Sequence, residues 1–557
     1  MKTTFDDLNI IQASPLYAES DFASIDIELY HADKSRLHRP TGEFASMQIS
    51  FDGKNVYVIQ NVNDLTYLFG DVLPRVKTWV MQNAKFDITQ LRRWVKIPPR
   101  DAHDTLLFDR ILWSGYFDTF NLADQSRRYL QLYMEKETRE EFYKTDVMND
   151  EMIHYAALDA AATWRIAQRQ LKIARPEDCY VWREFDQTAM WALLDFRGFP
   201  IDVDRWMEMA IRNKAEADAM KAEFIEKHGF NPNSHVQVKK YFKTKDAQAE
   251  TLSELKDPLA HRVVEFKEIS RLASTYGENW LEYVETIDGI PVVVCAYDPN
   301  RADTSRMASD SPNMQNIPIR KTKAFRECFI APPGYVLLIA DFSSQEPRIT
   351  AYLTGSKALA DIFKSGQDVY CATHKMVYEE EITKKDKQKR DDAKTLFLAV
   401  NYGMSAAGFS ARTGKSLKES EAAINRFFNV FDGTKEWADN QLKNSQYVDL
   451  DTGRRLWLNP YENTWTRNVL NTPHQGLGSE IIKRSLHYMH VRWTAEFGTF
   501  GVVEVTHDEI GALVPEELAQ QGVEFMGSCM VEAAESLTPG IPAKADVHIC
   551  HNWAEKD

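Results

Sequence analysis

The sequence predicts a multidomain protein of mixed α/β and α+β class, and three observations support this. The chain of 557 residues is too long for one hydrophobic core. From Phe22 to about Gln170, short β-like runs alternate with helical stretches, which is typical of an α/β domain. Further on, two strand-like apolar runs end in Asp341 and Asp508, with a long helical stretch between them. We therefore expect an α/β domain followed by a larger unit whose sheet a helical insertion interrupts.

Composition and charge exclude several classes of protein. Hydrophobic residues make up 44% of the chain and charged residues 27%, and no apolar stretch is long enough to span a membrane. Six cysteines are scattered without paired spacing, which favours a reducing compartment over a disulfide framework. The net charge of −15 argues against a protein that simply coats nucleic acid, although it permits a local basic groove. We expect a cytoplasmic protein with no membrane segment.

The sequence that follows about residue 176 is typical of helices. Asp204 is the predicted N-cap of a helix that ends at Gly229, since glycine suits the left-handed conformation that follows a helix. A mainly helical arm is predicted over 205–285, and a second helical region over about 356–445. The sequence is strand-like again from Tyr447, and two strand-like segments that resemble a hairpin surround Asp508.

The N-terminal region combines four acids with a tyrosine. Asp26 and Glu28 are two residues apart on a strand pattern, so both side chains project from the face opposite the apolar neighbours. Asp87 adds a third acid. Asp159 adds a fourth in a segment typical of a helix, with Tyr155 one turn before it. A solvated surface explains each acid singly, but charge embedded in an apolar strand is costly without a partner. The set suits two-metal hydrolysis of a phosphodiester, in which Tyr155 positions the water.

Asp341 and Asp508 form a second acidic pair. Each closes an apolar β-like run, and two carboxylates on neighbouring strand ends can hold two Mg²⁺ ions about 3.5–4 Å apart. Such a pair of ions drives phosphoryl transfer. The sequence therefore predicts a second two-metal site, far along the chain from the first.

Two sets of residues recur at every fourth position, which places each set along one helix face. A solvated helix face is the alternative to a binding surface in both cases. The first set has a basic end that can grip a phosphate-sized anion, and comprises Arg390, Lys394, Leu398 and Tyr402. The second set comprises Arg467, Asn471 and Gln475.

The acids of the first site resemble a known family in order and spacing. The pattern Asp26-x-Glu28, Asn83-x-x-x-Asp87 and Tyr155-x-x-x-Asp159 is similar to the proofreading 3′→5′ exonuclease domain of family A DNA polymerases, the bacterial polymerase I family. This resemblance implies an RNase H-like fold for the first domain. Because Asp26 comes so early, no separate 5′-nuclease domain is expected before it.

The second acidic pair belongs to motifs that resemble the same family. Asp341 opens a segment like motif A, in which Glu346 takes the position that restricts ribonucleotides. Gln345 lies in the part of this motif that departs from the commonest bacterial form and resembles a phage form. The sequence His507-Asp508-Glu509 resembles motif C, which implies that Asp508 completes the metal pair and that its two neighbours lie near the primer end.

The four-residue stripes and several arginines then acquire implied roles. The first stripe resembles motif B, where Arg390 and Lys394 clasp the triphosphate, Lys394 also protonates pyrophosphate, and Tyr402 stacks beneath the templating pair. Leu398 departs from the usual aromatic, from which we predict poor acceptance of dideoxynucleotides. The residues with an implied DNA contact, at the minor groove, the backbone or the template and primer, are Arg306, Arg454, Arg467, Asn471, Gln475 and His507.

The resemblance extends from about Phe22 to Trp553 and implies a domain plan. It gives an exonuclease domain at 1–175 and a right-hand polymerase domain at 176–557. The latter divides into a thumb (about 205–285), a palm (about 290–355 and 446–557) and fingers (about 356–445).

The implied function is a template-directed DNA polymerase with proofreading, in phage DNA replication. The implied cofactor is Mg²⁺, two ions at each site, with Mn²⁺ as the alternative, and the implied partners are primer-template DNA and deoxynucleoside triphosphates. A replisome helicase or a processivity factor is a candidate further partner. The alternatives are a DNA-binding 3′→5′ exonuclease with an inactive polymerase half and a non-catalytic scaffold. Two full sets of acids disfavour the scaffold.

Overall fold

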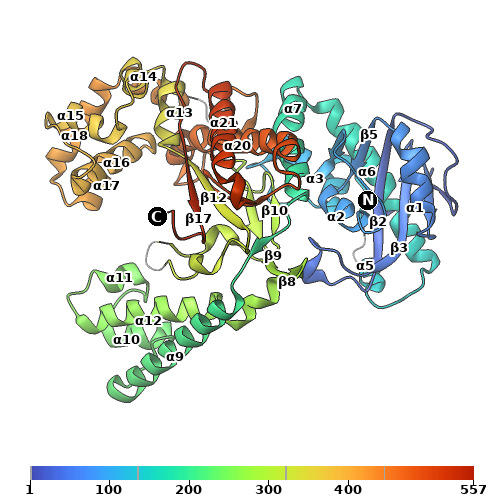
Figure 1. The fold of residues 1–557 in the computed structure, drawn as a ribbon, viewed down its shortest axis with the longest axis horizontal. Coiled ribbons are helices and arrows are strands. Elements are labelled where there is room, and N and C mark those ends of the chain that lie inside the picture. Colours follow the sequence, from blue (N-terminus) through green and yellow to red (C-terminus); the bar gives the residue numbers. More distant parts are fainter. Residues whose placement is uncertain (1–2, 135–136, 320–322, 444–445, 557) are drawn as a thin grey trace.

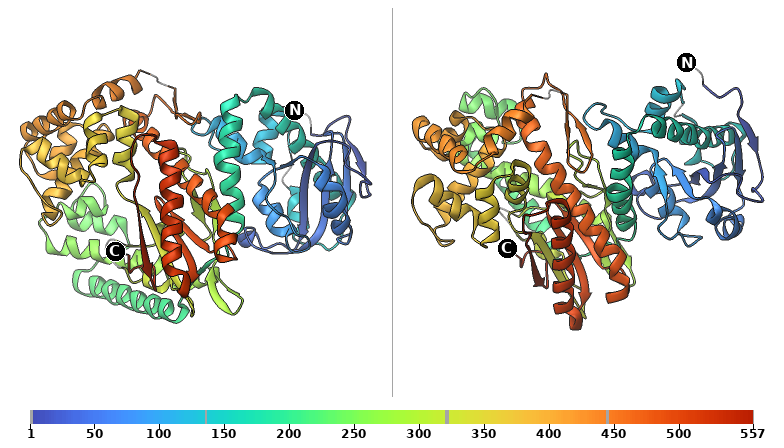
Figure 2. Two further views of the ribbon diagram at one scale, coloured as in Figure 1. Left: turned by 45° about the horizontal axis from the view of Figure 1, so that its top comes forward. Right: turned by 90° about the horizontal axis from the view of Figure 1, so that it is seen from above.

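The computed structural model describes residues 3–134, 137–319, 323–443 and 446–556. The N-terminal α/β region, blue in Figure 1, lies at one end of the molecule. The remainder surrounds a second sheet and carries two helical lobes, which lie on the side away from the N-terminal region in both further views (Figure 2). The two acidic sites predicted from the sequence therefore belong to two different sheets.

The first sheet has six strands, and β2 (Phe22–Tyr30) lies inside it. In β2, Ile25 and Ile27 are fully buried on one face while Asp26 and Glu28 point to the other, as predicted. Helix α6 (Asp150–Ile173) packs against β2, β3 and β4. The strands, in their order across the sheet, are β1 (Asn9–Ile11), β4 (Asn55–Ile59), β3 (Glu43–Ser50), β2, β5 (Thr78–Met81) and β6 (Ala102–Asp104).

The second sheet is antiparallel and forms the centre of the larger unit. Helix α20 (Trp465–Phe497) packs on α21 (Ala519–Leu537), and α21 packs in turn on β12 and β17. The apolar run before Asp341 is buried in this sheet, so the acid reaches its end on a rigid strand. The strands in order are β15 (Val502–Thr506), β16 (Glu509–Pro515), β12 (Tyr335–Phe342) and β17 (Ala545–Cys550).

The predicted thumb region is a helical arm. Its first helix starts two residues earlier than predicted, because Asp202 rather than Asp204 is the N-cap and accepts a hydrogen bond from the Arg205 backbone N–H at 3.0 Å. Gly229 ends this helix in the left-handed conformation, as predicted, with φ of 69°. The arm comprises α9 (Val203–His228), α10 (His235–Phe242), α11 (Ala249–Ser253) and α12 (Pro258–Thr275).

The predicted fingers region is the other helical lobe, yellow to orange in Figure 1. Its core is aromatic, with Phe397, Phe427 and Phe431 packed edge to face. The predicted boundary at residue 445 lies outside the described residues. Helix α13 (Gln345–Thr354) leads into this region from the predicted palm. The helices of the region are α14 (Lys357–Lys364), α15 (Val369–Tyr378), α16 (Lys387–Asn401), α17 (Ala406–Thr413), α18 (Leu417–Val430) and α19 (Thr434–Gln441).

The hairpin of β13 (Tyr447–Asp449) and β14 (Arg455–Trp457) packs against α3 (Thr105–Trp113) of the N-terminal region. The Trp457 ring stacks on Trp113, its indole N–H donates to the Leu112 carbonyl at 2.8 Å, and its backbone N–H donates to Ser114 at 3.0 Å. Gly115 adopts φ of 82°, and a Cβ there would lie 2.0 Å from the Trp457 carbonyl oxygen. Backbone and ring contacts thus join the two halves directly.

Two further features bear on the environment of the protein. All six cysteines are free thiols, with three of them buried. Among the helices of the described ranges, none has the length and apolar content that a membrane crossing demands.

Two candidate active sites

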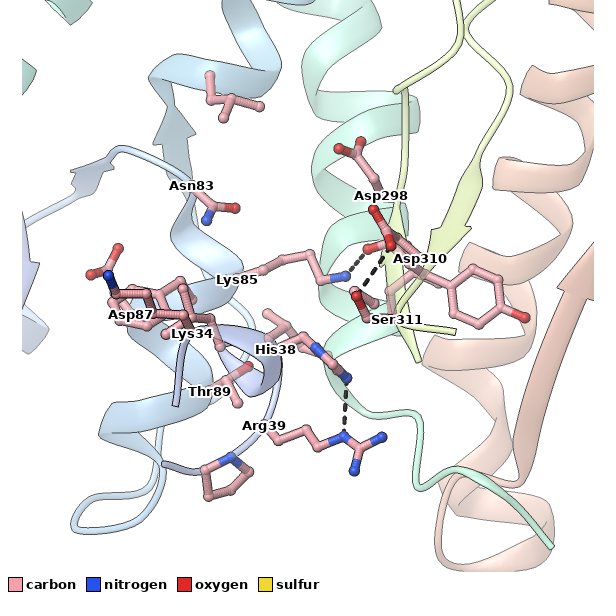
Figure 3. A pocket seen from close by; sticks show the side chains of 18 of the residues that line it. Lys34, His38, Arg39, Asn83, Lys85, Asp87, Thr89, Asp298, Asp310 and Ser311 are labelled. Carbon is pink, nitrogen blue, oxygen red and sulfur yellow. Dashed lines mark hydrogen bonds between the residues drawn. The ribbon is translucent and has the colours of Figure 1, made fainter. Parts of the chain in front are cut away.

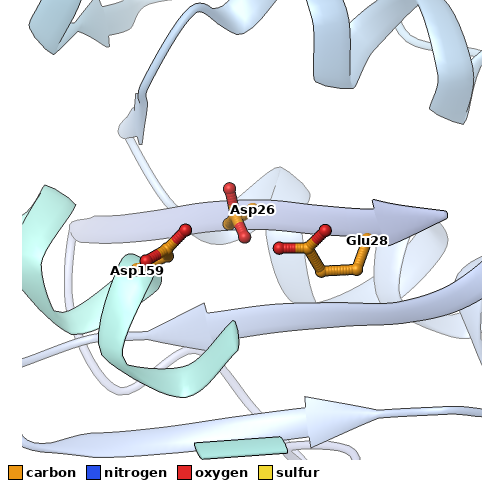
Figure 4. A group of neighbouring side chains, drawn as sticks. All are labelled: Asp26, Glu28 and Asp159. Carbon is orange, nitrogen blue, oxygen red and sulfur yellow. The ribbon is translucent and has the colours of Figure 1, made fainter. Parts of the chain in front are cut away.

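The first acidic site lies on the polar face of β2, against α6. Asp26 and Glu28 come from the strand and Asp159 from the helix, and each offers a carboxylate oxygen within 4.8 Å of the others (Figure 4). The alternation of the strand forces both of its acids onto one face, and the packing of α6 supplies the third. The structure therefore brings together three of the four acids that the sequence predicted.

Asp87 approaches this group from α2 (Ala84–Leu91), which follows Asn83 in the left-handed conformation. The start of α2 is fixed by Asp104, whose carboxylate accepts the N–H groups of Asn83 and Ala84 at 3.2 and 2.7 Å. The same carboxylate caps α3 by accepting the N–H groups of Leu106 and Leu107. Asp104 thus sets the position of Asp87 through the backbone.

The carboxylates of the first site repel one another. Asp87 is 1% exposed, and within the described chain neither of its carboxylate oxygens has a hydrogen-bond partner. Burial, and then the neighbouring Asp87 and Glu28, raises the pKa of Asp26 well above its usual range. Burial and the charge of Asp159 raise the pKa of Glu28 to about 8, and burial raises that of Asp159 to about 7. Such a group is ionised in full only when positive charge arrives.

A cavity of about 1010 Å³ opens over these acids, between the N-terminal region and the second sheet. Tyr155 lines it together with the four acids, and Arg139 contributes positive charge from the same wall. Across the cavity from Asp87 lie Asp298 and Asp310, as Figure 3 shows. The space above the acids is therefore large enough for a nucleotide-sized ligand.

The second acidic site lies where β12 ends beside the β15–β16 turn. Asp341 pairs in register with Glu509, and the N–H of Phe342 donates to the Asp508 carbonyl at 3.3 Å. Asp341 and Asp508 are 167 residues apart in sequence and lie on adjacent backbone, as predicted. Burial, together with the nearby charge of Asp341, raises the pKa of Asp508 to about 6.

Glu509 differs from its neighbours because it is fully partnered. Its two oxygens accept from the Trp553 indole N–H and the Lys556 ammonium, both at 2.7 Å, and the Arg326 guanidinium lies 3.6 Å away. Burial opposes ionisation of Glu509, but Lys556 and then Arg326 hold its pKa below the usual range. Glu509 therefore carries its charge in this site without a metal.

Residues of the first predicted stripe contact the N-terminal ends of α13 and α15. The Tyr402 hydroxyl donates to the Glu346 carboxylate at 2.6 Å, and the Arg306 guanidinium lies 3.8 Å from the same carboxylate. Arg390 makes a two-pronged ion pair with Asp368, with a shortest distance of 2.9 Å. On the same face of α16, Lys394 is exposed and Leu398 is half-buried. The stripe thus lines one open surface of the lobe.

The second predicted stripe lies on the open side of α20. Arg467 is exposed and Asn471 and Gln475 are half-buried, whereas the intervening positions Leu470 and His474 are buried. His507 is exposed at the tip of the β15–β16 turn. The Gln345 amide donates to the Gly478 carbonyl of α20 at 3.5 Å. A role of Gln345 in binding the substrate stays a prediction.

The prediction that Arg454 contacts the DNA backbone is wrong. Its guanidinium is buried and donates to both oxygens of Asp186, at 3.0 and 2.9 Å, and to Glu480 at 2.7 Å. Lys483 donates to the same Asp186 at 2.6 Å, so the four side chains form a closed charge cluster with exposures of 0–2%. The sequence Gly453-Arg454-Arg455 gave no sign that its first arginine turns inward, because the two acids lie far away in the chain.

Sequence reasoning also missed several residues of the sites. Lys556, Arg326 and Asp104 were not predicted, although each contacts a predicted residue or fixes its backbone. Asp104 alone had a local signal, because an acid before the Thr105–Trp113 helical run is a typical N-cap. Nothing near Lys556 or Arg326 in the chain distinguishes them from surface cations.

Comparison with known proteins agrees with both sites. Residues 207–555 match the family model of DNA polymerase family A, and residues 16–173 match that of a 3′-5′ exonuclease. The DNA polymerase I of Pseudomonas aeruginosa is 31% identical over 325 residues, which cover 56% of this chain and 35% of that protein. The DNA polymerase I of Rhizobium leguminosarum is 25% identical over 540 residues, which cover 87% and 52%. The chain thus matches about half, or less, of the length of these relatives.

A solved structure shows the fold across the whole chain. The polymerase domain of Pol1 from M. smegmatis, in complex with a DNA primer-template and a dNTP, covers 99% of this chain with a TM-score of 0.83 and 20% identity. The predicted fold, an RNase H-like exonuclease domain followed by a right-hand polymerase domain, is confirmed.

Proposed function

The chain belongs to DNA polymerase family A, and from this premise we propose that it extends a DNA primer on a template and edits the new 3′ end in a second site. The observation that carries the proposal is the presence of two separate carboxylate centres, each on its own sheet. One joins Asp26, Glu28 and Asp159, with Asp87 beside them, and the other joins Asp341 and Asp508. The substrates would be primer-template DNA and deoxynucleoside triphosphates.

The carboxylates fit divalent cations. Oxygen donors are the ligands that Mg²⁺ prefers, and Asp87 and Asp159 hold buried oxygens with no hydrogen-bond partner in the described chain. We propose Mg²⁺ as the ion at both sites, with Mn²⁺ as the alternative. When bound, such a pair of ions lowers the pKa of an attacking water or hydroxyl and neutralises charge on the leaving oxygen.

In the proposed polymerase site, the protein positions reactants rather than reacting covalently. Asp341 and Asp508 would hold the ions, and the Tyr402–Glu346 pair would form a rigid floor against the sugar of the incoming nucleotide. Lys394 is exposed and free to reach the phosphates, where its ammonium can donate a proton to pyrophosphate. Arg390 would have to share its guanidinium between Asp368 and a triphosphate.

In the proposed exonuclease site, the hydroxyl of Tyr155 lies beside the acid group and would orient the attacking water. Arg139 would lie near the scissile phosphate, where its charge offsets that of the substrate. The cavity over the acids would hold the unpaired 3′ nucleotide. The poor acceptance of dideoxynucleotides at Leu398, a helicase or processivity partner, and a role in phage replication stay predictions.

The alternative is an exonuclease whose polymerase half only binds DNA. A labelled primer with a mismatched 3′ end, mixed with Mg²⁺ and all four deoxynucleotides, distinguishes the two. We expect trimming followed by growth, loss of growth in Asp508→Ala, and loss of trimming in Asp26→Ala combined with Glu28→Ala. Shortening without growth in the unmodified protein would support the alternative, and growth in Asp508→Ala would refute our assignment of the polymerase site.

A further inference from the structure

Lys556, which was not among the predicted site residues, lies inside the proposed polymerase site. The Lys556 ammonium is 2.7 Å from Glu509 and 3.2 Å from Asp341, and its side chain is 15% exposed. Two carboxylates of the catalytic strands therefore share one cation that comes from the segment after β17. No other ammonium of the described residues forms an ion pair with Asp341.

The segment that carries Lys556 is firmly anchored. The Trp553 ring is fully buried, its indole N–H donates to Glu509, and its backbone N–H donates to the Phe329 carbonyl at 2.9 Å. The Arg326 guanidinium stacks on this ring at 4.0 Å. Because the tryptophan fixes the chain three residues earlier, the ammonium is held at the site rather than sampling solvent.

The two ion pairs of Lys556 are unequal. Glu509 is 8% exposed and makes the shorter contact, whereas Asp341 is 28% exposed and makes the longer one. A ligand entering from solvent therefore meets the Asp341 side of the ammonium first. A lysine suits a releasable contact, since its compact ammonium sits on a flexible stem and binds no carboxylate in a two-pronged way.

On the basis of the proposed polymerase function, we propose that Lys556 is an internal counter-ion that competes with the divalent cation for Asp341. Binding of the metal displaces the ammonium from Asp341, while its contact with Glu509 remains. Metal and ammonium cannot share the same Asp341 oxygen at close range, because two cations there repel each other. Lys556 thus offsets the charge of the two carboxylates before the metal binds, and it lowers the affinity of the site for metal.

The test measures Mn²⁺ binding directly, by electron paramagnetic resonance of free Mn²⁺, in the full chain. All proteins carry Asp26→Ala and Glu28→Ala, so that only the polymerase site is observed. We expect Lys556→Met to bind Mn²⁺ about five- to tenfold more tightly, as befits removal of one positive charge in contact with a ligand. Lys556→Arg keeps the charge and should bind no more tightly than the parent.

A matched control comes from α9 of the helical arm. Lys214 makes an exposed 3.1 Å ion pair with Asp218, so Lys214→Met removes the same charge away from Asp341 and Glu509 and should leave Mn²⁺ affinity unchanged. Lys556→Gln provides a second neutral variant if Lys556→Met fails to fold, as judged by circular dichroism.

The outcomes separate this inference from the function on which it rests. Mn²⁺ binding that survives Asp508→Asn would contradict the proposed polymerase site, and the role of Lys556 with it. Mn²⁺ binding that requires Asp508 but is unchanged or weakened in the neutral Lys556 variants would overturn the counter-ion role of Lys556. The proposed polymerase site would be unaffected by that result. Tighter Mn²⁺ binding in those variants, absent in Lys214→Met, supports the counter-ion role of Lys556.

Discussion

Two groups of acids in this molecule have opposite surroundings. Asp26, Glu28, Asp87 and Asp159 face one another with raised pKa values, and the oxygens of Asp87 make no hydrogen bond of good geometry within the described chain. Asp186 and Glu480 are fully buried, and Arg454 and Lys483 lie between them.

The difference shows how a structural acid is told from a functional one. Desolvation alone would raise the pKa of Asp186, yet Arg454 and Lys483 hold it below the usual range, so the two acids are balanced by two cations of the protein itself. The first group is complete only with added positive charge, which is the property of a metal site. Three substitution or pH experiments test this contrast.

The largest effect is expected from breaking the paired cluster. Arg454→Met leaves two buried carboxylates without their shared partner and should lower the free energy of unfolding by about 3–5 kcal/mol. Urea denaturation of the full chain measures it. The neighbouring Arg455 provides the control, because its pair with Asp449 is partly exposed to solvent and its loss should cost about 1 kcal/mol or less. Equal effects of the two substitutions would show that the inner cluster contributes no more than a surface pair.

Substitution of Asp87 in the first site should change the free energy of unfolding in the opposite direction. Asp87→Asn removes a buried carboxylate that has no partner and should raise the free energy of unfolding by about 1–2 kcal/mol in EDTA. Nuclease activity on a single-stranded primer should fall on the order of 100-fold, as for loss of one electrostatic group of an active site.

Asp104→Asn is the matched control for this substitution. Asp104 is buried beside Asp87, but it accepts four backbone hydrogen bonds, so its substitution should destabilise by about 1–3 kcal/mol. Destabilisation of the protein by Asp87→Asn would mean that Asp87 has a structural role.

The smallest effect is expected in the pH dependence of stability. The folded protein raises the pKa of Glu28 to about 8 and of Asp159 to about 7, so between the ordinary values near 4 and these pH values it holds protons that the unfolded chain has lost. Their contribution to stability is therefore present at pH 4 and lost as pH rises towards 8. Asp186 has the opposite sign, since its contribution is present above pH 4 and lost only in acid.

Thermal unfolding in EDTA between pH 5 and pH 8 measures this difference. The midpoint should fall with rising pH in the unmodified protein and fall less in Asp26→Ala combined with Glu28→Ala, while Mg²⁺ should restore it at pH 8. An identical pH slope in the double variant would show that these acids are not the source.

The sequence predicted most of what depends on local pattern. The alternation of β2 placed Asp26 and Glu28 on one face, and the four-residue spacing of Arg467, Asn471 and Gln475 placed them on the open side of α20. Residues that act through distant partners were beyond such reasoning. Arg454 is drawn inward by Asp186, 268 residues earlier, and Lys556 meets Asp341 only because β17 pairs with β12. Neither signal exists within a short window of the chain.

The stacked tryptophans between α3 and the β13–β14 hairpin have a consequence for proofreading. Because Trp457 bonds to the backbone of Leu112 and Ser114, and Gly115 leaves no gap at the junction, the two reaction centres are separated by a rigid spacer. Under the proposed function, an error in the growing strand would be corrected only when the strand itself separates from the template and crosses that interval. The stability of the last few base pairs, rather than any closing of the protein, would set how often editing begins.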